Sequence, residues 1–467
     1  MSDTHVLIVG AGPTGLALGI DLARRGVPAL VVERGESLFP GSRGKGMQPR
    51  TMEVFDDLGV LDAIHAAGGG YPVGMIWRDG ERVGEHHMFE PAEPTEDAPY
   101  NAPWMVPQWR TQRILLERLE ELGGKVSYGR EVTGVTQDED GVTAHFASGG
   151  PVRARYLVAA DGGRSVVRRA VGVGMTGEDV DPLPSLVADV RITGLDRDNW
   201  HLFPQGEGTE ELLAVCPLAG TEDFQLVARF TEGTEVDLSL DGIRQVVAAR
   251  SHLAAEAVTE VRWASDFRPR AALADRFRVG RVFLAGDAAH VHSPAGGQGL
   301  NTSVQDAYNL GWKLGAVLGD GADAALLDTY EEERRPIAGQ MLGLSTSVHR
   351  GETRRGGATR QLGIGYPGSA LTTEARTAPG PVRAGDRAPD ATVDGVRLFD
   401  AFRGPHWTLL ALGVAAPEPP AAVRLVRGPA HATYGTGLFL VRPDGYVGWA
   451  GDTPAGLTGY LARFSRG

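Results

Sequence analysis

The glycine pattern near the start of the chain constrains its fold more than any other feature. A β-branched run at residues 5–9 leads into Gly10-Ala11-Gly12-Pro13-Thr14-Gly15, and apolar residues at helical spacing follow. A second apolar run then ends in Glu33. This order of strand, G-x-G-x-x-G, helix, strand and acid is typical of a βαβ unit that binds a dinucleotide. A glycine turn without a ligand is the alternative interpretation.

Each glycine of this pattern has a mechanical reason. Gly10 would make the tight turn after the strand, and Gly12 would let the backbone approach a pyrophosphate. Gly15 would let the helix pack closely on the strand. Glu33 is placed to accept hydrogen bonds from a ribose. The pattern therefore predicts a Rossmann-like α/β domain.

A second stretch, residues 281–301, has the features of a ligand-binding edge. Four apolar residues, 282–285, predict a short buried strand that ends at Gly286-Asp287. A turn rich in glycine follows, and helical sequence resumes at about Thr302. A carboxylate at a strand's carboxyl end, a glycine turn and a helix N-terminus commonly bind a ligand together. A further strand ends at Asp161-Gly162 in the same manner.

The remaining patterns predict a discontinuous domain organisation. Several alternating runs between residues 182 and 232 predict an antiparallel sheet inserted into the nucleotide domain. Pro336 should kink or split a long helix that starts near residue 324. We expect the following divisions: a dinucleotide-binding domain at 1–178 and 262–350, a substrate-binding sheet at 179–261 with parts of 71–104, a loose linker at 351–381, and a small α/β domain at 382–467.

Composition excludes several classes of protein. The net charge is −13 and no long block of Lys or Arg is present, which argues against nucleic acid as a partner. No apolar run reaches the roughly 20 residues that span a bilayer. The single cysteine, Cys216, forms no intramolecular disulfide or CxxC pair, so redox chemistry must come from a cofactor. At 467 residues we expect a multidomain, soluble, cytoplasmic protein.

Taken together, the three motifs resemble those of a known family. GAGPTG with Glu33, the Asp161-Gly162 pair, and GDAAHVHSPAGGQGLN at 286–301 are similar to those of the group A flavoprotein monooxygenases, the single-component FAD-dependent aromatic hydroxylases. The resemblance covers about residues 1–345. The tail, with GLFLVRPDGYVGWAGD, resembles the thioredoxin-like C-terminal domain of the branch that acts on aromatic polyketides, phenols and rifamycin-type antibiotics. Without a CxxC it would be structural or serve assembly, for instance of a homodimer.

The resemblance implies roles for individual residues around FAD. The first motif would hold the pyrophosphate and ribose, Arg43 would lie over the pyrophosphate, and the later motifs would hold the ribityl chain and the isoalloxazine ring. No side chain is assigned as a catalytic acid or base; Pro294, Gly297 and Gly299 form the flavin environment. The implied cofactor-binding set is Gly10, Gly12, Pro13, Thr14, Gly15, Glu33, Arg34, Arg43, Arg110, Asp161, Gly162, Gly286, Asp287, Pro294, Gly297, Gly299, Leu300 and Asn301.

The same resemblance implies the chemistry. NADPH or NADH would reduce the flavin, dioxygen would add at flavin C4a, and the hydroperoxide would transfer oxygen to an electron-rich aromatic substrate. A second βαβ unit that carries GxGxxG in its first turn is not predicted for the nicotinamide, as in this family. Baeyer–Villiger oxidation, epoxidation and antibiotic inactivation on the same scaffold stay open as alternatives. So does a flavin-binding or substrate-carrying protein without turnover.

Other side chains attract functional interpretations that the sequence supports less well. His290 and His292 form an H-x-H pair without a further Cys or His cluster, so we expect no metal site and a structural role for His290. Cys216 lies in an apolar run and is expected in the core. Gln112 stands where the family more usually has a Glu. Residues that could reach a substrate, or merely pack, are His86, His87, Trp104 and Arg268.

Overall fold

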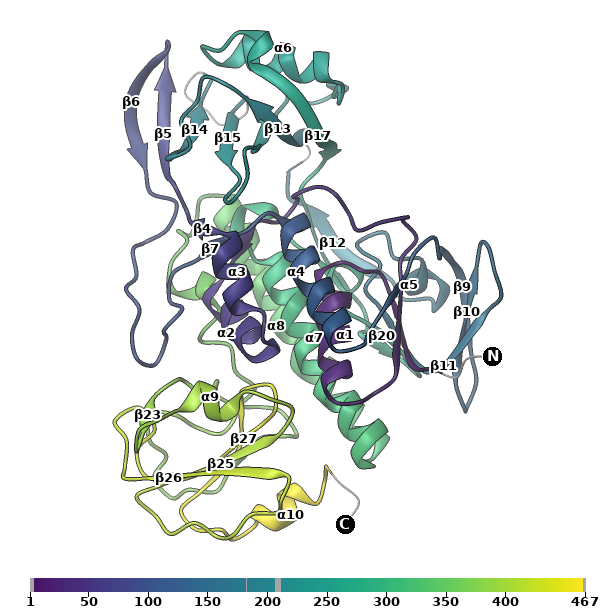
Figure 1. The fold of residues 1–467 in the computed structure, drawn as a ribbon, viewed down its shortest axis with the longest axis vertical. Helices are drawn as coiled ribbons and strands as arrows, with labels where there is room; N and C mark the ends of the chain where they lie inside the picture. The colour runs from purple at the N-terminus through teal and green to yellow at the C-terminus, as the bar shows by residue number, and fades with distance from the viewer. Residues whose placement is uncertain (1–3, 182, 206–210, 465–467) are drawn as a thin grey trace.

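The computed structural model describes residues 4–181, 183–205 and 211–464. A seven-stranded sheet lies at one end of the molecule, an eight-stranded sheet with its helices in the middle, and a five-stranded C-terminal sheet at the other end (Figure 1). The eight-stranded sheet has the order β19-β20-β11-β1-β2-β8, with the β9–β10 hairpin on β11. Its strands are β1 Thr4–Val9, β2 Ala29–Val32, β8 Val126–Ser127, β9 Val132–Gln137, β10 Val142–Phe146, β11 Val152–Ala159, β19 Arg278–Val279 and β20 Val282–Leu284.

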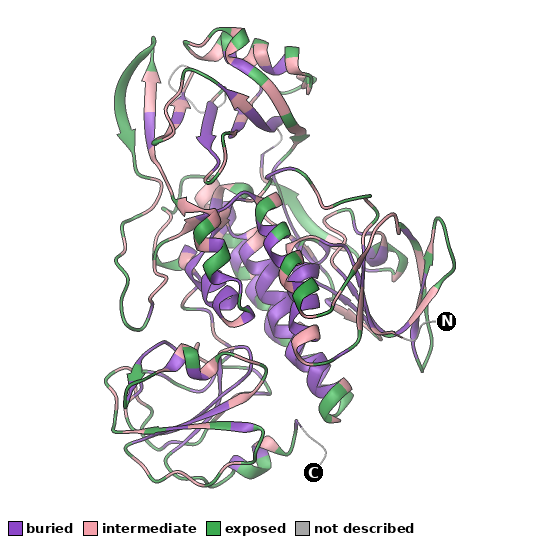
Figure 2. Ribbon diagram, viewed as in Figure 1, coloured by how far each residue is buried: buried purple, intermediate pink, exposed green. Residues whose placement is uncertain are grey.

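Helices pack on this sheet and on each other. They are α1 Pro13–Arg24, α2 Pro49–Leu58, α3 Leu61–Ala67, α4 Gln108–Glu121, α5 Val166–Ala170, α7 Gly299–Gly315 and α8 Asp328–His349. Helix α7 is buried from Asn301 to its end and forms the centre of the molecule (Figure 2). Gly311 allows its close approach to α1, because a Cβ there would lie 2.2 Å from the Asp21 carboxylate. Helix α8 continues through Pro336, so the predicted split does not occur.

The inserted sheet forms as predicted, with two differences. Its order is β17-β13-β16-β15-β14-β5-β6, and α6 Leu240–Arg250 packs against it. The β14–β5 pair is parallel, so the sheet is not wholly antiparallel. Strand β17 runs past the predicted boundary at 261, because no glycine or proline interrupts it. The strands are β5 Val73–Arg78, β6 Glu81–His86, β13 Ser185–Ile192, β14 Asn199–Phe203, β15 Leu213–Pro217, β16 Phe224–Arg229 and β17 Val258–Phe267.

Short strands join these layers. Two three-stranded sheets have the orders β3-β7-β4 and β12-β18-β21. Their members are β3 Gly46–Met47, β4 Gly69–Gly70, β7 Trp104–Met105, β12 Met175–Asp179, β18 Arg270–Ala274 and β21 His290–Val291. None of the helices in the described part of the chain is long and apolar enough to cross a membrane.

The C-terminal sheet includes part of the segment that we expected to be a loose linker. Its order is β22-β28-β27-β25-β26, and β22 lies within residues 351–381. Ile364, Tyr366 and Leu371 of that segment are buried, so it is packed rather than loose. The elements are β22 Thr373–Glu374, β23 Thr392–Val393, β24 Val396–Arg397, α9 Leu398–Phe402, β25 Trp407–Leu412, β26 Val423–Gly428, β27 Gly437–Val441, β28 Val447–Gly451 and α10 Leu457–Leu461.

The C-terminal sheet shares a core and an ionic cluster with the central helices. The Trp312 ring of α7 meets Trp407 of β25 edge-on, with 5.6 Å between the ring centroids. Arg442, after β27, binds both carboxylate oxygens of Glu333 on α8, at 2.7 and 2.9 Å. Glu333 also accepts a hydrogen bond from Lys313 of α7 at 2.7 Å. These charged side chains are almost fully buried, so the cluster requires all its members.

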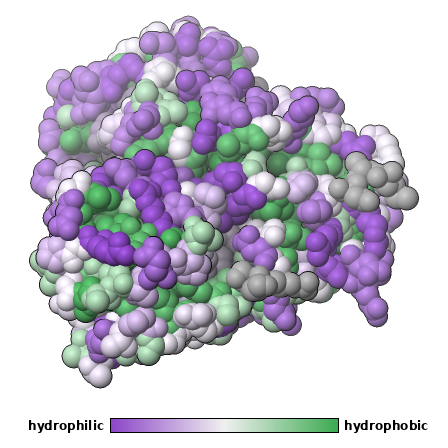
Figure 3. Space-filling view, turned by 60° about the horizontal axis from the view of Figure 1, so that its bottom comes forward, coloured by the Kyte–Doolittle hydropathy of each residue, from purple (hydrophilic) through white to green (hydrophobic). Residues whose placement is uncertain are grey.

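Few large hydrophobic side chains are exposed in the described part of the chain. Hydrophilic side chains alternate with smaller hydrophobic areas on the face that brings the C-terminal domain forward (Figure 3). Among the described residues, Val83 and Val396 are the large hydrophobic side chains that are exposed.

The ionic cluster predicts that the C-terminal domain is needed for stability. Arg442→Met should lower the free energy of unfolding by about 3–5 kcal/mol, because it leaves the buried Glu333 and Asp444 with too little positive charge. Urea unfolding followed by circular dichroism measures this. The control is Arg427→Met, which removes an exposed arginine paired with the exposed Glu418 and should cost less than about 1 kcal/mol. Equal losses in the two variants would contradict the role of the cluster.

Candidate functional site

The three sequence motifs meet at one edge of the eight-stranded sheet. Strands β1, β11 and β20 are parallel neighbours, with Val9 beside Ala159 and Ala159 beside Leu284. Each motif directly follows one of these strands. The carboxyl ends of parallel strands are where open α/β sheets bind ligands.

The glycines of the first motif have the geometry that their predicted roles require. Gly10 has φ +107°, and a Cβ there would lie 2.3 Å from the Ala160 carbonyl oxygen. A Cβ on Gly15 would lie 2.0 Å from the Gly10 carbonyl oxygen, so only glycine lets α1 pack this closely. A Cβ on Gly12 would meet no heavy atom within 4 Å. Gly12 therefore borders open space at the N-terminus of α1.

That helix N-terminus is free to bind an anion. Gly12 precedes α1, Pro13 stands at its start, and no acidic side chain lies in its first turn. Its first N–H groups and the positive end of the helix dipole are thus unopposed. The Glu33 carboxylate accepts hydrogen bonds from the Ala11 N–H at 2.9 Å and the Gly35 N–H at 3.0 Å. Glu33 therefore shapes the motif turn, whatever else it binds.

Two carboxylates at this edge have unused hydrogen-bonding capacity. Asp161 accepts the Val166 N–H at 2.8 Å through Oδ2, while its buried Oδ1 has no partner. The Asp287 side chain is exposed and makes no hydrogen bond or ion pair within the described residues. The surrounding protein nevertheless raises the pKa of the Asp287 carboxyl by desolvation, against the charges of His290 and Arg43. Both acids can receive ligand hydroxyl groups.

The turn after β21 brings a second helix N-terminus to the same edge. Pro294–Gly296 form a 3-10 turn, Gly297 has φ +63°, and α7 then begins without an acid in its first turn. The Asn301 side chain holds this turn in place, since its amide donates to the Gly297 carbonyl oxygen at 2.8 Å and to that of Gly46 at 2.9 Å. Its Oδ1 accepts the Gln48 N–H at 2.7 Å. The side chain of Asn301 is therefore committed to holding the turn.

A buried carboxylate that the sequence did not single out fixes this arrangement. Asp306 accepts hydrogen bonds from the Gly286 N–H at 3.0 Å, from His290 at 2.5 Å and from Arg334 at 2.8 Å. Arg334 also donates to the Thr302 carbonyl oxygen at 3.1 Å. His290 therefore has the structural role that we expected. No group of three His, Cys, Asp or Glu side chains in the described part of the chain could hold a metal ion.

Other candidates are distributed around the site. Arg34, Arg43 and Arg110 are exposed, and the Arg43 guanidinium lies 5.3 Å from the centre of the Phe39 ring. Gln112 is buried and donates to the Phe39 carbonyl oxygen at 2.9 Å, so it supports that loop. The residues expected either to reach a substrate or to pack have separate positions. His86 and His87 are exposed, Trp104 donates to the Ile64 carbonyl oxygen at 3.2 Å, and Arg268 follows β17. Cys216, which we expected in the core, is buried.

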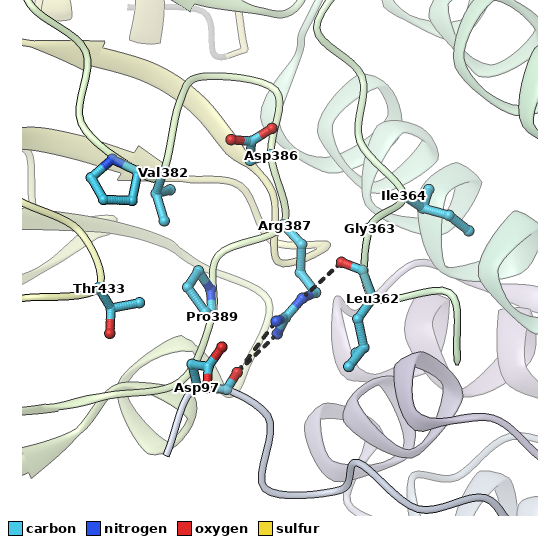
Figure 4. Close-up of a pocket in the computed structure, with 10 residues that line it drawn as sticks. Asp97, Leu362, Gly363, Ile364, Val382, Asp386, Arg387, Pro389 and Thr433 are labelled. Atoms are coloured by element: carbon cyan, nitrogen blue, oxygen red, sulfur yellow. Dashed lines mark hydrogen bonds between the residues drawn. The ribbon is translucent and has the colours of Figure 1, made fainter. Parts of the chain in front are cut away.

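A cavity of about 390 Å³ lies elsewhere, between the C-terminal domain and residues 362–364 (Figure 4). Arg387, which lines the cavity, donates hydrogen bonds to the Leu362 carbonyl oxygen at 3.2 Å and to the Glu53 carboxylate at 2.8 Å. None of the predicted cofactor residues lines this cavity. It is distinct from the edge where the three motifs meet.

Comparison with known proteins gives a consistent result along the chain. Residues 3–345 match the family model for an FAD binding domain, and residues 382–465 match that for the C-terminal domain of aromatic-ring hydroxylases. The chain is 47% identical to a flavin-dependent monooxygenase of Mycobacteroides abscessus, covering 98% of this chain and 99% of that protein. It is 34% identical to a rifampicin monooxygenase of Rhodococcus hoagii, covering 99% and 98%.

A solved structure shares the whole architecture. The ternary complex of aklavinone-11 hydroxylase with FAD and aklavinone superposes with a TM-score of 0.79 at 28% identity, over 99% of each chain.

The Asp306 network predicts a large stability effect from one side chain. Asp306→Ala should lower the free energy of unfolding by about 3–5 kcal/mol, because it leaves Arg334 buried without a counter-charge. Chemical unfolding of the purified variant measures this. Asp328→Ala is the matched control, since it removes an exposed carboxylate paired with Arg278 and should cost less than about 1 kcal/mol. A variant at Asp306 as stable as the control would show that the network is not required.

Proposed function

The chain belongs to the family of FAD-dependent aromatic-ring monooxygenases, and from this membership we propose how its own residues hold FAD and which substrate it takes. It is an enzyme that uses FAD and a reduced nicotinamide. We propose that the substrate is a polycyclic phenol, and that it is bound between the α7 turn and the seven-stranded sheet. The meeting of the three motifs at one sheet edge is the observation that supports the proposed FAD placement.

The residues at that edge fit FAD on structural grounds. The open space beside Gly12 accommodates a pyrophosphate against the N–H groups of α1. The unpaired Asp287 carboxylate suits the hydroxyl groups of a ribityl chain, and Asp161 has a free acceptor oxygen nearby. Arg43 and Arg110 are exposed and offer further donors. Each of these groups has a binding capacity that the protein itself does not use.

When bound, FAD supplies the transfer of electrons from NADPH or NADH and the activation of dioxygen. The chain's contribution is electrostatic and geometric. The N–H groups of Gly299, Leu300 and Asn301 at the start of α7 place a positive potential where the isoalloxazine ring would lie. Such fixed dipoles stabilise negative charge without reorganisation during the reaction. Pro294 and Gly297 shape the turn that presents them.

An aromatic wall supports the proposed substrate class. Tyr71 meets Phe89 edge-on at 4.7 Å and lies 6.4 Å from the Trp200 ring, measured between ring centroids. The adjoining segments reach the flavin turn, because Arg355, over Phe89, donates to the Ala295 carbonyl oxygen. Aromatic side chains favour offset or edge-on contact with other rings. A planar polycyclic substrate has the surface to use this wall.

Asp287 tests the FAD placement. Asp287→Ala should weaken FAD binding by about tenfold or more, since a hydrogen bond to a charged group contributes about 1.5–3 kcal/mol. Fluorescence titration of the apoprotein with FAD gives the dissociation constant. The thermal midpoint of the apoprotein should not fall, because Asp287 makes no bond within the described residues. Full retention of FAD affinity would remove Asp287 from the site.

Turnover tests the function itself. The FAD-loaded protein should oxidise NADPH or NADH faster when a polycyclic phenol is present, consume dioxygen, and release a product heavier by one oxygen atom. Mass spectrometry with labelled dioxygen identifies the source of that atom. An FAD-loaded protein that neither consumes dioxygen nor modifies any member of a panel of polycyclic phenols would contradict this function.

A further inference from the structure

A group of donors between the flavin turn and the seven-stranded sheet lies outside the set of residues that we propose to hold FAD. We call it the cationic cluster and define it as Lys45, Arg355 and Trp200. Lys45 lies in the loop before α2, Arg355 follows α8, and Trp200 belongs to β14. Lys45 lies over the Trp200 ring and within the electrostatic reach of Arg355, so three distant parts of the chain meet here.

Lys45 is a buried cation without an ion-pair partner. Its side chain is 8% exposed, and Nζ donates to the Gln225 amide oxygen at 2.6 Å. Nζ also lies 4.2 Å from the centre of the Trp200 ring. No carboxylate in the described part of the chain comes within ion-pair distance of it. Burial consequently lowers the pKa of Lys45 below its ordinary value.

The two other members of the cluster also have N–H groups that the protein does not use. The Trp200 indole N–H is buried and has no hydrogen-bond partner. A buried unpaired donor costs about 1–3 kcal/mol, so it marks a place where an acceptor is missing. Arg355 uses one guanidinium nitrogen on the Ala295 carbonyl oxygen and lies 5.2 Å from the Phe89 ring centre. It also has no ion-pair partner among the described residues.

The acidic groups around the cluster form no ion pair with it. Burial raises the pKa of the Cys216 thiol and that of the Tyr71 hydroxyl, so both stay neutral at pH 7. The field of the Asp189 carboxylate reaches Lys45, and burial raises the pKa of Asp189 to about 6. Glu90, whose N–H donates to the Arg355 carbonyl oxygen, is exposed, and neither it nor Asp189 forms an ion pair with Lys45 or Arg355. A buried charge of this kind is stabilised by an opposite charge that arrives with a ligand.

The cluster is fixed next to the flavin turn. The Asn301 amide that closes this turn on Gly297 also binds the Gly46 carbonyl oxygen, directly after Lys45. The Lys45 carbonyl oxygen accepts the Val106 N–H at 2.8 Å. Arg355 is bound to the turn itself through Ala295. An anion held by the cluster would therefore have a set position relative to the α7 N-terminus.

We propose that Lys45, Arg355 and the Trp200 indole N–H bind an anionic oxygen of the substrate, so that the enzyme selects aromatic compounds in their ionised form. The inference rests on the proposed function and adds the charge state of the substrate and the residues that recognise it. A phenolate or an aromatic carboxylate supplies the required oxygen. Ionisation of a phenol also makes its ring richer in electrons, which favours attack by an electrophilic oxygen.

Matched probes test the proposal on the FAD-loaded protein. Alizarin carries an acidic phenol, and alizarin dimethyl ether has the same rings without one. Anthraquinone-2-carboxylate and anthraquinone form the corresponding carboxylate pair. After FAD content per chain is measured, each probe is titrated and binding is followed by the change in flavin absorption. We expect the acidic member of at least one pair to bind about tenfold or more tightly than its neutral partner; the pair that shows it identifies the source of the anion.

Variants assign the preference to the cluster. Lys45→Met should abolish the preference for the acidic probe and leave the neutral probe unaffected, whereas Lys45→Arg, which keeps the charge, should retain it within about threefold. Trp200→Phe keeps a ring and removes the N–H, and should weaken only the acidic probe. Lys125→Met, at an exposed lysine, is the matched control and should behave as the wild type.

The outcomes separate this inference from the proposed function. A chain that takes up no FAD overturns both. An FAD-loaded wild type that binds the members of each pair equally, or binds none of the probes, overturns the anion site. If that protein still consumes oxygen with other phenols, the proposed function stands. A Lys45→Met variant that holds FAD and keeps the preference overturns it as well. The comparison of the paired probes on the wild type uses no variant, so it still tests the proposal if a variant fails to fold.

Discussion

The structure depends on the buried carboxylate of Asp306. This side chain joins the Gly286 N–H at the end of β20, His290 in β21 and Arg334 of α8, and it belongs to α7 itself. Burial opposes its ionisation, but the charges of His290 and Arg334 outweigh that effect and lower the pKa of Asp306. Its contribution to stability is therefore present at neutral pH and is lost when acid protonates it in the folded state. Asp306 thus ties α7 to the strand ends, while the Asn301 side chain holds the turn that precedes it.

The other end of α7 is anchored by the C-terminal domain. Lys313, near the last turn of the helix, shares Glu333 with Arg442, and the Trp312 indole N–H donates to Asp444 at 3.0 Å. A domain without cysteine cannot perform thiol redox chemistry, and these contacts give it a structural task. It neutralises charges that the FAD-binding domain buries. We infer that the N-terminus of α7 is positioned as much by this distant domain as by its own turn.

The sequence predicted the parts of the site that are made of backbone, and missed the parts that are made of paired side chains. Gly10 and Gly15 could be assigned because a positive φ and a close helix–strand contact exclude other residues. Asp306 and Arg334 are separated by 28 positions on two helices, so their pairing appears only once the helices pack. The parallel β14–β5 pair and the packed segment around Tyr366 were missed for the same reason. Their stabilising neighbours lie far away in the chain.

Backbone groups line the proposed cofactor site and side chains line the proposed substrate site, so the two sites can vary in sequence to different degrees. Backbone N–H groups and glycines at the α1 and α7 N-termini present the same surface whatever side chains surround them, which suits a constant cofactor. The opposite wall consists of side chains from β14, the loop before α2 and the segment after α8, which lie outside the glycine turns. Asn301 connects the two, since one amide binds both the Gly297 and the Gly46 carbonyl oxygens. A substitution at Lys45 therefore changes which substrate is selected, while the flavin turn keeps its geometry.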